Sequence, residues 1–149
     1  MQEAESLCTN IDVRFLGRIF AIYAQYERDK GRLAGALKLS RESYKLYQTL
    51  DDKLLVAHSA RHIADILCGL GIHSEAQEYY QKALDIYRAS ACTDMQGLAN
   101  TLCPYGIMLL HLGDVDKAKE FLQEAKLIYE SIGSKAGIEE LQRLLKSIK

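Results

Sequence analysis

Three glycines mark a formula that the chain repeats, and this repetition constrains the fold more than any other feature. Gly31, Gly71 and Gly113 lie 40 and 42 residues apart. Small residues occupy three fixed positions around each glycine: Ala24, Ala64 and Gly106 seven residues before it, Ala36, Ala76 and Ala118 five residues after it, and Ser43, Ala83 and Ala125 twelve residues after it. A tyrosine follows sixteen residues after each glycine, at Tyr47, Tyr87 and Tyr129. A fixed period in this range predicts stacked supersecondary units.

The spacing of apolar residues predicts that these units are helical. Apolar side chains recur every three or four residues between the breaks, which is the periodicity of helices with one buried face. The expected helices cover about 11–30, 33–49, 53–70, 74–89, 95–112, 115–132 and 135–148. Predicted N-caps are Asp51 or Asp52, Ser74 in a capping box with Gln77, and Asp114. The short turns predict antiparallel hairpins, and residues 1–10 are expected to be flexible.

The repeated residues resemble the tetratricopeptide repeat family. In its pattern a small residue packs within the hairpin, a glycine ends the first helix, and an alanine and an aromatic residue follow on the second. The best match is Ala64, Gly71, Ala76, Tyr80 and Ala83, followed by Gly106, Gly113, Ala118, Leu122 and Ala125. The first unit, with Ala24, Gly31, Ala36, Ser40 and Ser43, matches less well. The unit of 40–42 residues is similar to the longer repeats of kinesin light chains and of bacterial regulators.

This resemblance implies an all-α fold, a right-handed superhelical α-solenoid of three antiparallel helix hairpins plus a C-terminal capping helix. The repeats would cover about 17–51, 57–91 and 99–132, and the capping helix about 135–148, within one domain spanning 11–149. Stacking would bury a continuous core between hairpins. Five tyrosines are expected to pack there: Tyr23, Tyr47, Tyr87, Tyr105 and Tyr129.

The composition argues against several other classes of protein. A formal net charge of -1 gives no general attraction to nucleic acid or to an anionic membrane. No apolar run approaches the roughly 18 residues of a membrane span, and no basic segment near the start resembles a signal peptide. The cysteines at 8, 68, 92 and 103 show no CxxC spacing and are expected to be reduced. We therefore expect a cytoplasmic protein that is neither an enzyme nor dependent on a cofactor.

The resemblance also implies where a partner would bind, because the first helix of each family hairpin lines a concave groove. On the first helix Arg14, Arg18, Ala21, Gln25 and Arg28 share one face. The groove residues predicted to bind a partner are Arg18, Gln25, Arg28, His58, Arg61, His62, Asp65 and Asn100. Guanidinium groups favour acidic or phosphorylated side chains. A solvated helix face is the commoner explanation of such a pattern. The family's carboxylate clamp of Lys and Asn is not supported.

Three features of the groove helices allow a second interpretation. His58 and His62 lie four apart on a helix and could share a zinc ion, but surface or groove histidines are the commoner case, and we predict no metal site. Pro104 interrupts a helical pattern and leaves the carbonyl of Asn100 without its intrahelical donor. A tolerated kink is the simpler account, and a carbonyl that accepts from a ligand is the alternative. A dyad of Cys103 and His62 is conceivable, but buried cysteine is usually inert.

The function expected from these features is a protein-interaction scaffold that binds a peptide or helix of a partner in its concave groove, with acidic side chains of that partner as candidate contacts. The alternatives are a self-assembling structural module, which would stack through its first or last helix, and a regulatory repeat domain cut from a larger protein. No nucleic acid or membrane partner is expected, and a homo-oligomer is possible.

Overall fold

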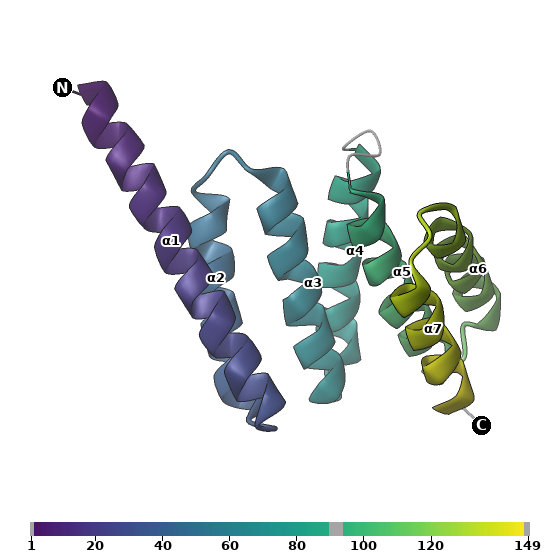
Figure 1. Cartoon of the computed structure of the whole chain (residues 1–149). Coiled ribbons are helices and arrows are strands. Elements are labelled where there is room, and N and C mark those ends of the chain that lie inside the picture. The colour runs from purple at the N-terminus through teal and green to yellow at the C-terminus, as the bar shows by residue number, and fades with distance from the viewer. Residues whose placement is uncertain (1, 90–93, 148–149) are drawn as a thin grey trace. The chain divides into compact units, whose positions relative to one another are not determined.

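The computed structural model describes residues 2–89 and 94–147, with side chains from Asp12 to Lys146 within those ranges. Over these residues the chain forms seven helices and no strand, which confirms the all-α prediction (Figure 1). The helices are α1 (Gln2–Asp29), α2 (Leu33–Gln48), α3 (Lys53–Gly69), α4 (His73–Ala89), α5 (Met95–His111), α6 (Val115–Ser131) and α7 (Lys135–Ser147). Cys92, Ile148 and residue 91, the expected end of the second repeat, lie outside the described residues, as does the side chain of Cys8.

Helix boundaries agree with the sequence prediction to within one or two residues, except at the start of α1. That helix begins at Gln2, nine residues before the expected start near Ile11. The segment contains no glycine or proline before Gly17 and is rich in Glu, Ala, Gln and Leu, which form helices well. The prediction was wrong because it required an apolar stripe, whereas a polar segment can continue a helix that packing has already nucleated.

The turns confirm the role assigned to the repeated glycines. Gly31, Gly71 and Gly113 have φ of 78°, 79° and 89°, a region that side chains with a Cβ rarely adopt. At Gly71 the backbone amide of Ile72 donates to the carbonyl of Leu67 at 2.9 Å, closing a Schellman motif.

The predicted caps are confirmed at two helices and wrong at one. Asp52 accepts from the amide of Leu55 at 3.3 Å, and Asp114 accepts from the amide of Lys117 at 3.4 Å. Helix α4 already begins at His73, so Ser74 lies inside the first turn and no capping box forms there. The hydroxyl of Ser74 has no hydrogen-bond partner in the described part of the chain.

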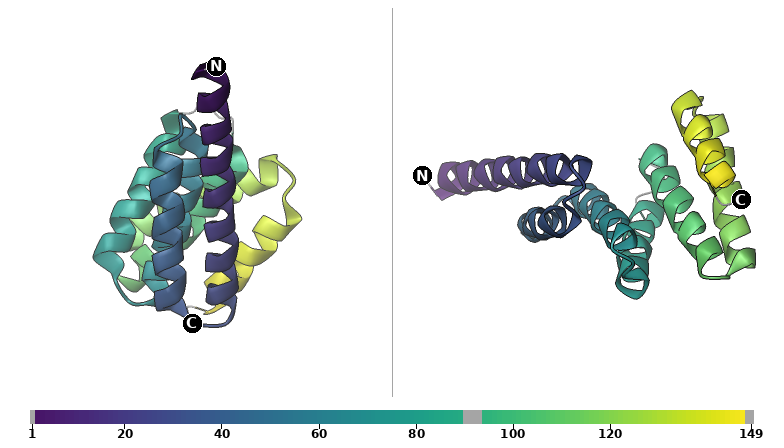
Figure 2. Two further views of the ribbon diagram at one scale, coloured as in Figure 1. Left: turned by 90° about the vertical axis from the view of Figure 1, so that its left-hand side faces the viewer. Right: turned by 90° about the horizontal axis from the view of Figure 1, so that it is seen from below.

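The chain divides into two compact units, Met1–Tyr79 and Tyr80–Lys149, which are described separately. In the first unit α1 and α2 form an antiparallel hairpin, and α1 extends beyond the end of α2 (Figure 2). Helix α2 packs against α3 as well. The hydroxyl of Ser43, which occupies one of the small-residue positions, donates to the carbonyl of Gly17 at 2.8 Å. The small residues thus allow α1 and α2 to approach closely.

In the second unit α5 and α6 form the main hairpin and α7 packs against it. Gly106 lies where a Cβ would come within 2.8 Å of Leu122 Cγ, so the small residue is required by packing. The rings of Tyr80 and Tyr105 stack at 5.2 Å between centroids, at an angle of 16°. Tyr129 is buried and donates its hydroxyl to the side-chain oxygen of Asn100 at 2.7 Å.

Tyr23 is an exception among the five tyrosines expected to pack between hairpins. Its side chain is 59% exposed, whereas the other four are buried. It belongs to an apolar surface of α1 that also contains Phe15, Leu16 and Tyr26, and that reaches Ile22 at the edge of the cavity described below. Helix α2 covers one side of α1, and these residues lie on another side.

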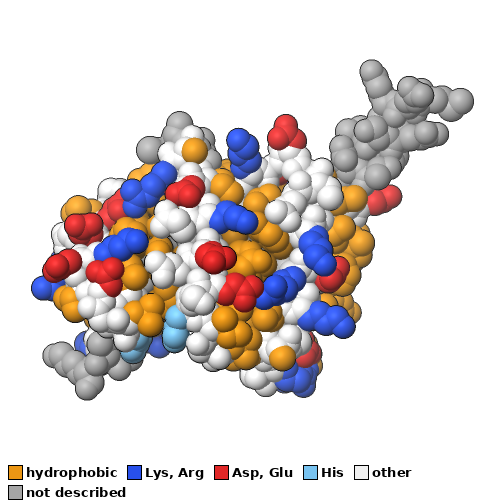
Figure 3. Space-filling view, turned by 180° about the vertical axis from the view of Figure 1, so that it is seen from behind, with side chains coloured by type: hydrophobic (Ala, Val, Ile, Leu, Met, Phe, Trp, Pro, Cys, Tyr) orange, Lys and Arg blue, Asp and Glu red, His pale blue; other side chains and the backbone are white. Residues whose placement is uncertain are grey.

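Charged side chains of both signs are interspersed with apolar ones on the face shown in Figure 3. This mixture agrees with the near-zero net charge of the sequence.

None of the described helices is long and apolar enough to cross a membrane. Among the described cysteines, Cys68 and Cys103 form no disulfide.

Candidate partner-binding cavity

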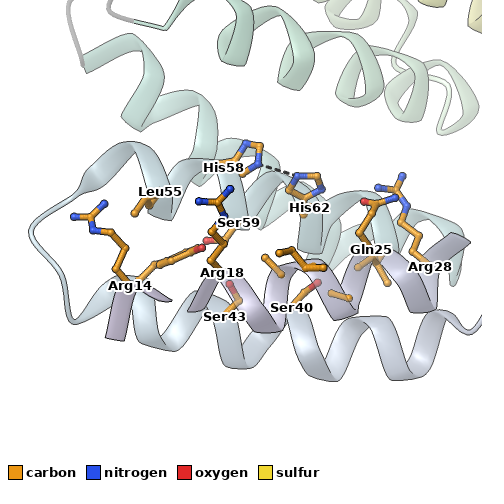
Figure 4. Close-up of a pocket in the computed structure, with 15 residues that line it drawn as sticks. Arg14, Arg18, Gln25, Arg28, Ser40, Ser43, Leu55, His58, Ser59 and His62 are labelled. Atoms are coloured by element: carbon orange, nitrogen blue, oxygen red, sulfur yellow. Dashed lines mark hydrogen bonds between the residues drawn. The ribbon is translucent and has the colours of Figure 1, made fainter. Parts of the chain in front are cut away.

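A cavity of about 540 Å³ opens between α1 and α3 in the first unit, with residues of α2 completing its wall. Figure 4 shows labelled side chains of α1 and α3 facing each other across it. Small side chains among the lining residues leave this volume open. The lining consists of Arg14, Arg18, Ala21, Ile22, Ala24, Gln25 and Arg28 from α1, Ser40, Ser43 and Tyr47 from α2, and Leu55, His58, Ser59, His62 and Ile66 from α3.

Three arginines from α1 give the cavity its positive character, because no Asp or Glu is among its lining residues. Arg14 donates to Asp52 at 3.0 Å, and this bond lowers the pKa of the Asp52 carboxyl. Arg28 lies 4.0 Å from Asp65. Arg18 forms no ion pair with any carboxylate in the described part of the chain. The helical spacing that predicted a shared face for these arginines is confirmed, because all of them border one cavity.

His58 and His62 form a hydrogen-bonded pair on the α3 side, with their Nε2 atoms 3.1 Å apart. Nη2 of Arg61 lies 3.4 Å from the same Nε2 of His62. Because a guanidinium can only donate, this Nε2 accepts, and His62 carries its proton on Nδ1. The bond between the rings then runs from Nε2–H of His58 to Nε2 of His62.

The surroundings of His62 oppose its protonation. Burial penalises the imidazolium, and the charges of Arg61, His58 and Arg28 repel it further. Together these effects lower the pKa of His62 to about 3. The imidazole is therefore neutral at physiological pH.

Arg61 and Asp65 lie beside the cavity without lining it. Their side chains are only 14% and 11% exposed and form an ion pair at 3.4 Å. Nε of Arg61 is buried and has no hydrogen-bond partner among the described residues. Asp65 is shared between Arg61 and Arg28, so one carboxylate serves two guanidinium groups.

Asn100, the remaining predicted groove residue, lies in the second unit. Its side-chain oxygen accepts from the hydroxyl of Tyr129 at 2.7 Å and from the amide of Gln96 at 3.1 Å. Gln25 does line the cavity, and its amide donates to Asp29 at 2.7 Å. The structure thus brings together Arg18, Gln25, Arg28, His58 and His62, with Arg61 and Asp65 adjacent.

The cavity also contains residues that sequence reasoning did not assign to the groove, including Tyr47, Leu55 and three serines, whereas Arg14 lies on the predicted groove face of the first helix. Ser43 and Ser59 donate to backbone carbonyls. Ser40 has no hydrogen bond to any described residue. A signal for this serine was present in the sequence, because Ser40 occupies the position filled by Tyr80 and Leu122 in the other repeats. The weaker family match of the first unit therefore coincides with the cavity.

A metal ion fits these residues poorly. In the part of the chain described, no group of three or more His, Cys, Asp or Glu side chains could hold one. The two histidines offer converging nitrogens, but Arg18, Arg28 and Arg61 surround them and repel a cation. An anion is the ligand that this charge distribution favours.

Comparison with known proteins gives a family match for part of the chain. Residues 18–89 match the family model described as "Tetratricopeptide repeat". No curated protein gives a significant match. Among solved structures, BtubC (BKLC) from P. vanneervenii has a similar fold, with a TM-score of 0.69 at 17% sequence identity over 91% of this chain. The chain spans 65% of the length of that protein. Residues 18–89, which contain the glycine-ended turns at Gly31 and Gly71, thus match the tetratricopeptide repeat family, and the solved structure shows a similar fold over most of the chain.

Proposed function

We propose that this protein is an interaction scaffold whose first unit binds an acidic segment of a partner in the cavity between α1 and α3. Tetratricopeptide repeats generally mediate protein–protein interaction, and they are scaffolds without catalytic activity of their own. The observation that carries the proposal is a cavity with three arginines and no carboxylate in its lining. The proposed contacts are Arg18, Gln25, Arg28, His58 and His62, with Arg61 and Asp65 behind them.

The cavity suits a peptide side chain better than a whole folded surface. Its volume of about 540 Å³ lies within the range of small-ligand sites, roughly 300–1,000 Å³. Ile22, Leu55 and Ile66 supply apolar walls for the stem of a side chain, while the arginines receive its charge. Affinity in such a site comes from a few anchors on a preorganised scaffold. The predicted involvement of Asn100 would require a longer partner segment that also reaches the second unit.

A display selection would test the proposal. Random peptides selected on the wild-type protein should be enriched in Asp, Glu or phosphorylated residues. Fluorescence anisotropy would then compare their binding to the wild type, to Arg18→Glu with Arg61→Glu, and to Arg143→Glu as a charge-reversal control on α7. We expect the double variant to lose binding and the control to retain it. Selected peptides that bind the double variant with wild-type affinity would refute the basic cavity as the site.

Self-assembly is a second candidate function, and the outer face of α1 favours it. Phe15, Ile22, Tyr23 and Tyr26 are 66%, 61%, 59% and 52% exposed and lie along one side of the helix. With aromatic side chains presenting about 150–250 Å² each, this surface offers roughly 500 Å² per copy. A pair of such faces would bury about 1,000 Å², near the lower limit for specific association. A second copy of the chain is the occupant we propose.

Light scattering across a range of concentrations separates the two candidates. A weak dimer should form at high concentration, and Phe15→Lys should abolish it without changing binding of selected peptides. Leu127→Lys, at an exposed apolar position on α6, is the matched control. A wild-type protein that remains monomeric at millimolar concentration excludes the second candidate.

A further inference from the structure

Two ion pairs set the direction and the length of the cavity. Arg14 and Arg28 line it near the two ends of its α1 wall. Arg14 bonds to Asp52 at 3.0 Å, just before α3 begins, and Arg28 lies 4.0 Å from Asp65, in the second half of α3. Helices α1 and α3 therefore run in the same direction along the cavity. The step from Arg14 to Arg28 corresponds to about 21 Å along a helix, so the site is elongated.

Each end of the cavity has a guanidinium group without a carboxylate of its own. Near the first end, Arg18 is exposed and forms no ion pair with a carboxylate of any described residue. At the other end, Arg28 and Arg61 share the single carboxylate of Asp65. About 15 Å of helix separates Arg18 from Arg28, a distance that their long side chains shorten from both sides. Because guanidinium groups pair with carboxylates, a ligand with a carboxylate at each end complements the cavity.

The middle of the cavity differs from its two ends, because α1 and α2 contribute no charged side chain there. The lining residues of this part are Ala21, Ile22, Ala24 and Gln25 on α1 and Ser40 on α2. Ile66 adds an apolar wall from α3. Small and apolar side chains leave room for a stem of methylene groups that joins the two carboxylates of a ligand.

Ser40 favours a ligand with a polar atom near the middle of that stem. It lines the cavity and is only 5% exposed, and its hydroxyl forms no hydrogen bond with any residue that the structure describes. Figure 4 shows Ser40 between Arg18 and Gln25 along the cavity. A ligand that covered this hydroxyl with methylene groups alone would leave a buried donor unpaired, which weakens binding. A carbonyl or hydroxyl oxygen at this point of the ligand would accept the hydrogen bond.

From this geometry we infer that the cavity binds a free dicarboxylate whose flexible stem carries a carbonyl or hydroxyl group near its middle. One carboxylate pairs with Arg18, the other pairs with Arg28, and the central oxygen accepts from Ser40. This ligand occupies the site that the proposed function gives to an acidic segment of a partner, so it displaces that segment. Only the displacement rests on the proposed function, because binding of the dicarboxylate itself requires no partner.

Pimelate, 4-oxopimelate and heptanoate are suitable probes for isothermal titration calorimetry, because all three have the same number of carbon atoms. Pimelate and 4-oxopimelate differ only in the central carbonyl group, and heptanoate has one carboxylate instead of two. We expect 4-oxopimelate to bind about threefold to tenfold more tightly than pimelate, which is the contribution of one hydrogen bond. Pimelate should bind at least about tenfold more tightly than heptanoate, because its second carboxylate gains a charged partner.

Two serine variants locate the central hydrogen bond. Ser40→Ala should abolish the preference for 4-oxopimelate over pimelate and leave the affinity for pimelate no weaker than in the wild type. Alanine forms helices well, so this variant is expected to fold. Ser59→Ala is the matched control, because Ser59 also lines the cavity but already donates to the carbonyl of Val56 at 3.0 Å. The preference for 4-oxopimelate should survive in that control.

Two arginine variants locate the ends of the ligand. Arg18→Gln and Arg28→Gln should each reduce the affinity for pimelate to about that of heptanoate, because each leaves one carboxylate without a partner. Arg143→Gln on α7 is the control and should bind pimelate like the wild type. Arg18 is exposed, so its replacement tests the site without disturbing the core.

Wild-type protein that binds neither dicarboxylate would overturn the inference, as would equal affinities for pimelate and heptanoate or for pimelate and 4-oxopimelate. A preference for 4-oxopimelate that persists in Ser40→Ala would also overturn it. An acetylated and amidated Glu-Gly-Glu peptide tests the other source of two carboxylates. If this peptide bound more tightly than 4-oxopimelate, the chemistry would belong to a partner segment and the free ligand would be refuted.

These failures differ from failure of the proposed function. Selected acidic peptides that depend on Arg18 and Arg61 would still show partner binding even if no dicarboxylate bound. Dicarboxylate binding without any selected peptide would refute only the scaffold role. A selected peptide that stayed bound in saturating 4-oxopimelate would refute the displacement.

Discussion

Replacing His62 with Gln should make the protein less sensitive to acid. The pKa of His62 is about 3 in the folded protein and near its ordinary value of 6.5 in the unfolded chain. Between these two values the unfolded chain binds a proton that the folded protein does not. Stability contributed by the neutral imidazole is therefore fully present above pH 6.5 and is lost as the pH falls toward 3.

The size of this loss follows from the shift. One pKa unit corresponds to about 1.4 kcal/mol, so lowering the pH from 7.0 to 5.0 removes about 2 kcal/mol of unfolding free energy through this residue. For a chain of this length that corresponds to roughly 4–8 °C in melting temperature. His62→Gln cannot titrate, so its unfolding free energy should fall by about 2 kcal/mol less than that of the wild type.

Urea unfolding at pH 7.0, 6.0 and 5.0, followed by circular dichroism, measures these free energies. His111→Gln is the matched control, because His111 is exposed at the end of α5 and should leave the wild-type pH dependence unchanged. Equal slopes of stability against pH for the wild type and His62→Gln would refute the reasoning. Such a result would mean that His62 is hydrated or that its neighbours move away on protonation.

Three further predictions concern stability and need only thermal or urea unfolding. Gly113→Ala should cost about 1 kcal/mol, because φ is 89° there, whereas Gly113→Asn should cost less; equal values for both would contradict this account. Ser43→Ala should cost about 1 kcal/mol by removing the buried hydrogen bond from its hydroxyl to the carbonyl of Gly17, and an unchanged midpoint would show that this bond contributes nothing to stability. Pro104→Ala should raise stability by about 1–3 kcal/mol, since it restores a donor to the carbonyl of Asn100; a loss would mean that Pro104 is needed for packing.

The candidate cavity was only partly predictable from the sequence. Helical spacing alone placed Arg18, Gln25 and Arg28 on one face, and the structure confirms that they share a cavity wall with His58 and His62. Spacing could not show that Arg61 and Asp65 bond to each other beside the cavity, or that Asn100 accepts from Tyr129. Those contacts depend on rotamers and on neighbouring helices, which no pattern along one helix encodes.

The sequence by itself determined the helices, the turns and the close packing within hairpins. These features depend on local chemistry: glycine at positive φ, aspartate at N-caps, and alanine where backbones approach. Only the tertiary structure decided that Tyr23 faces outward, that His58 bonds to His62, and that the buried Ser40 lines a cavity. Each of these outcomes depends on the distance between helices that are separate in the chain. Packing of the whole unit sets that distance, and the periodicity of a single helix does not.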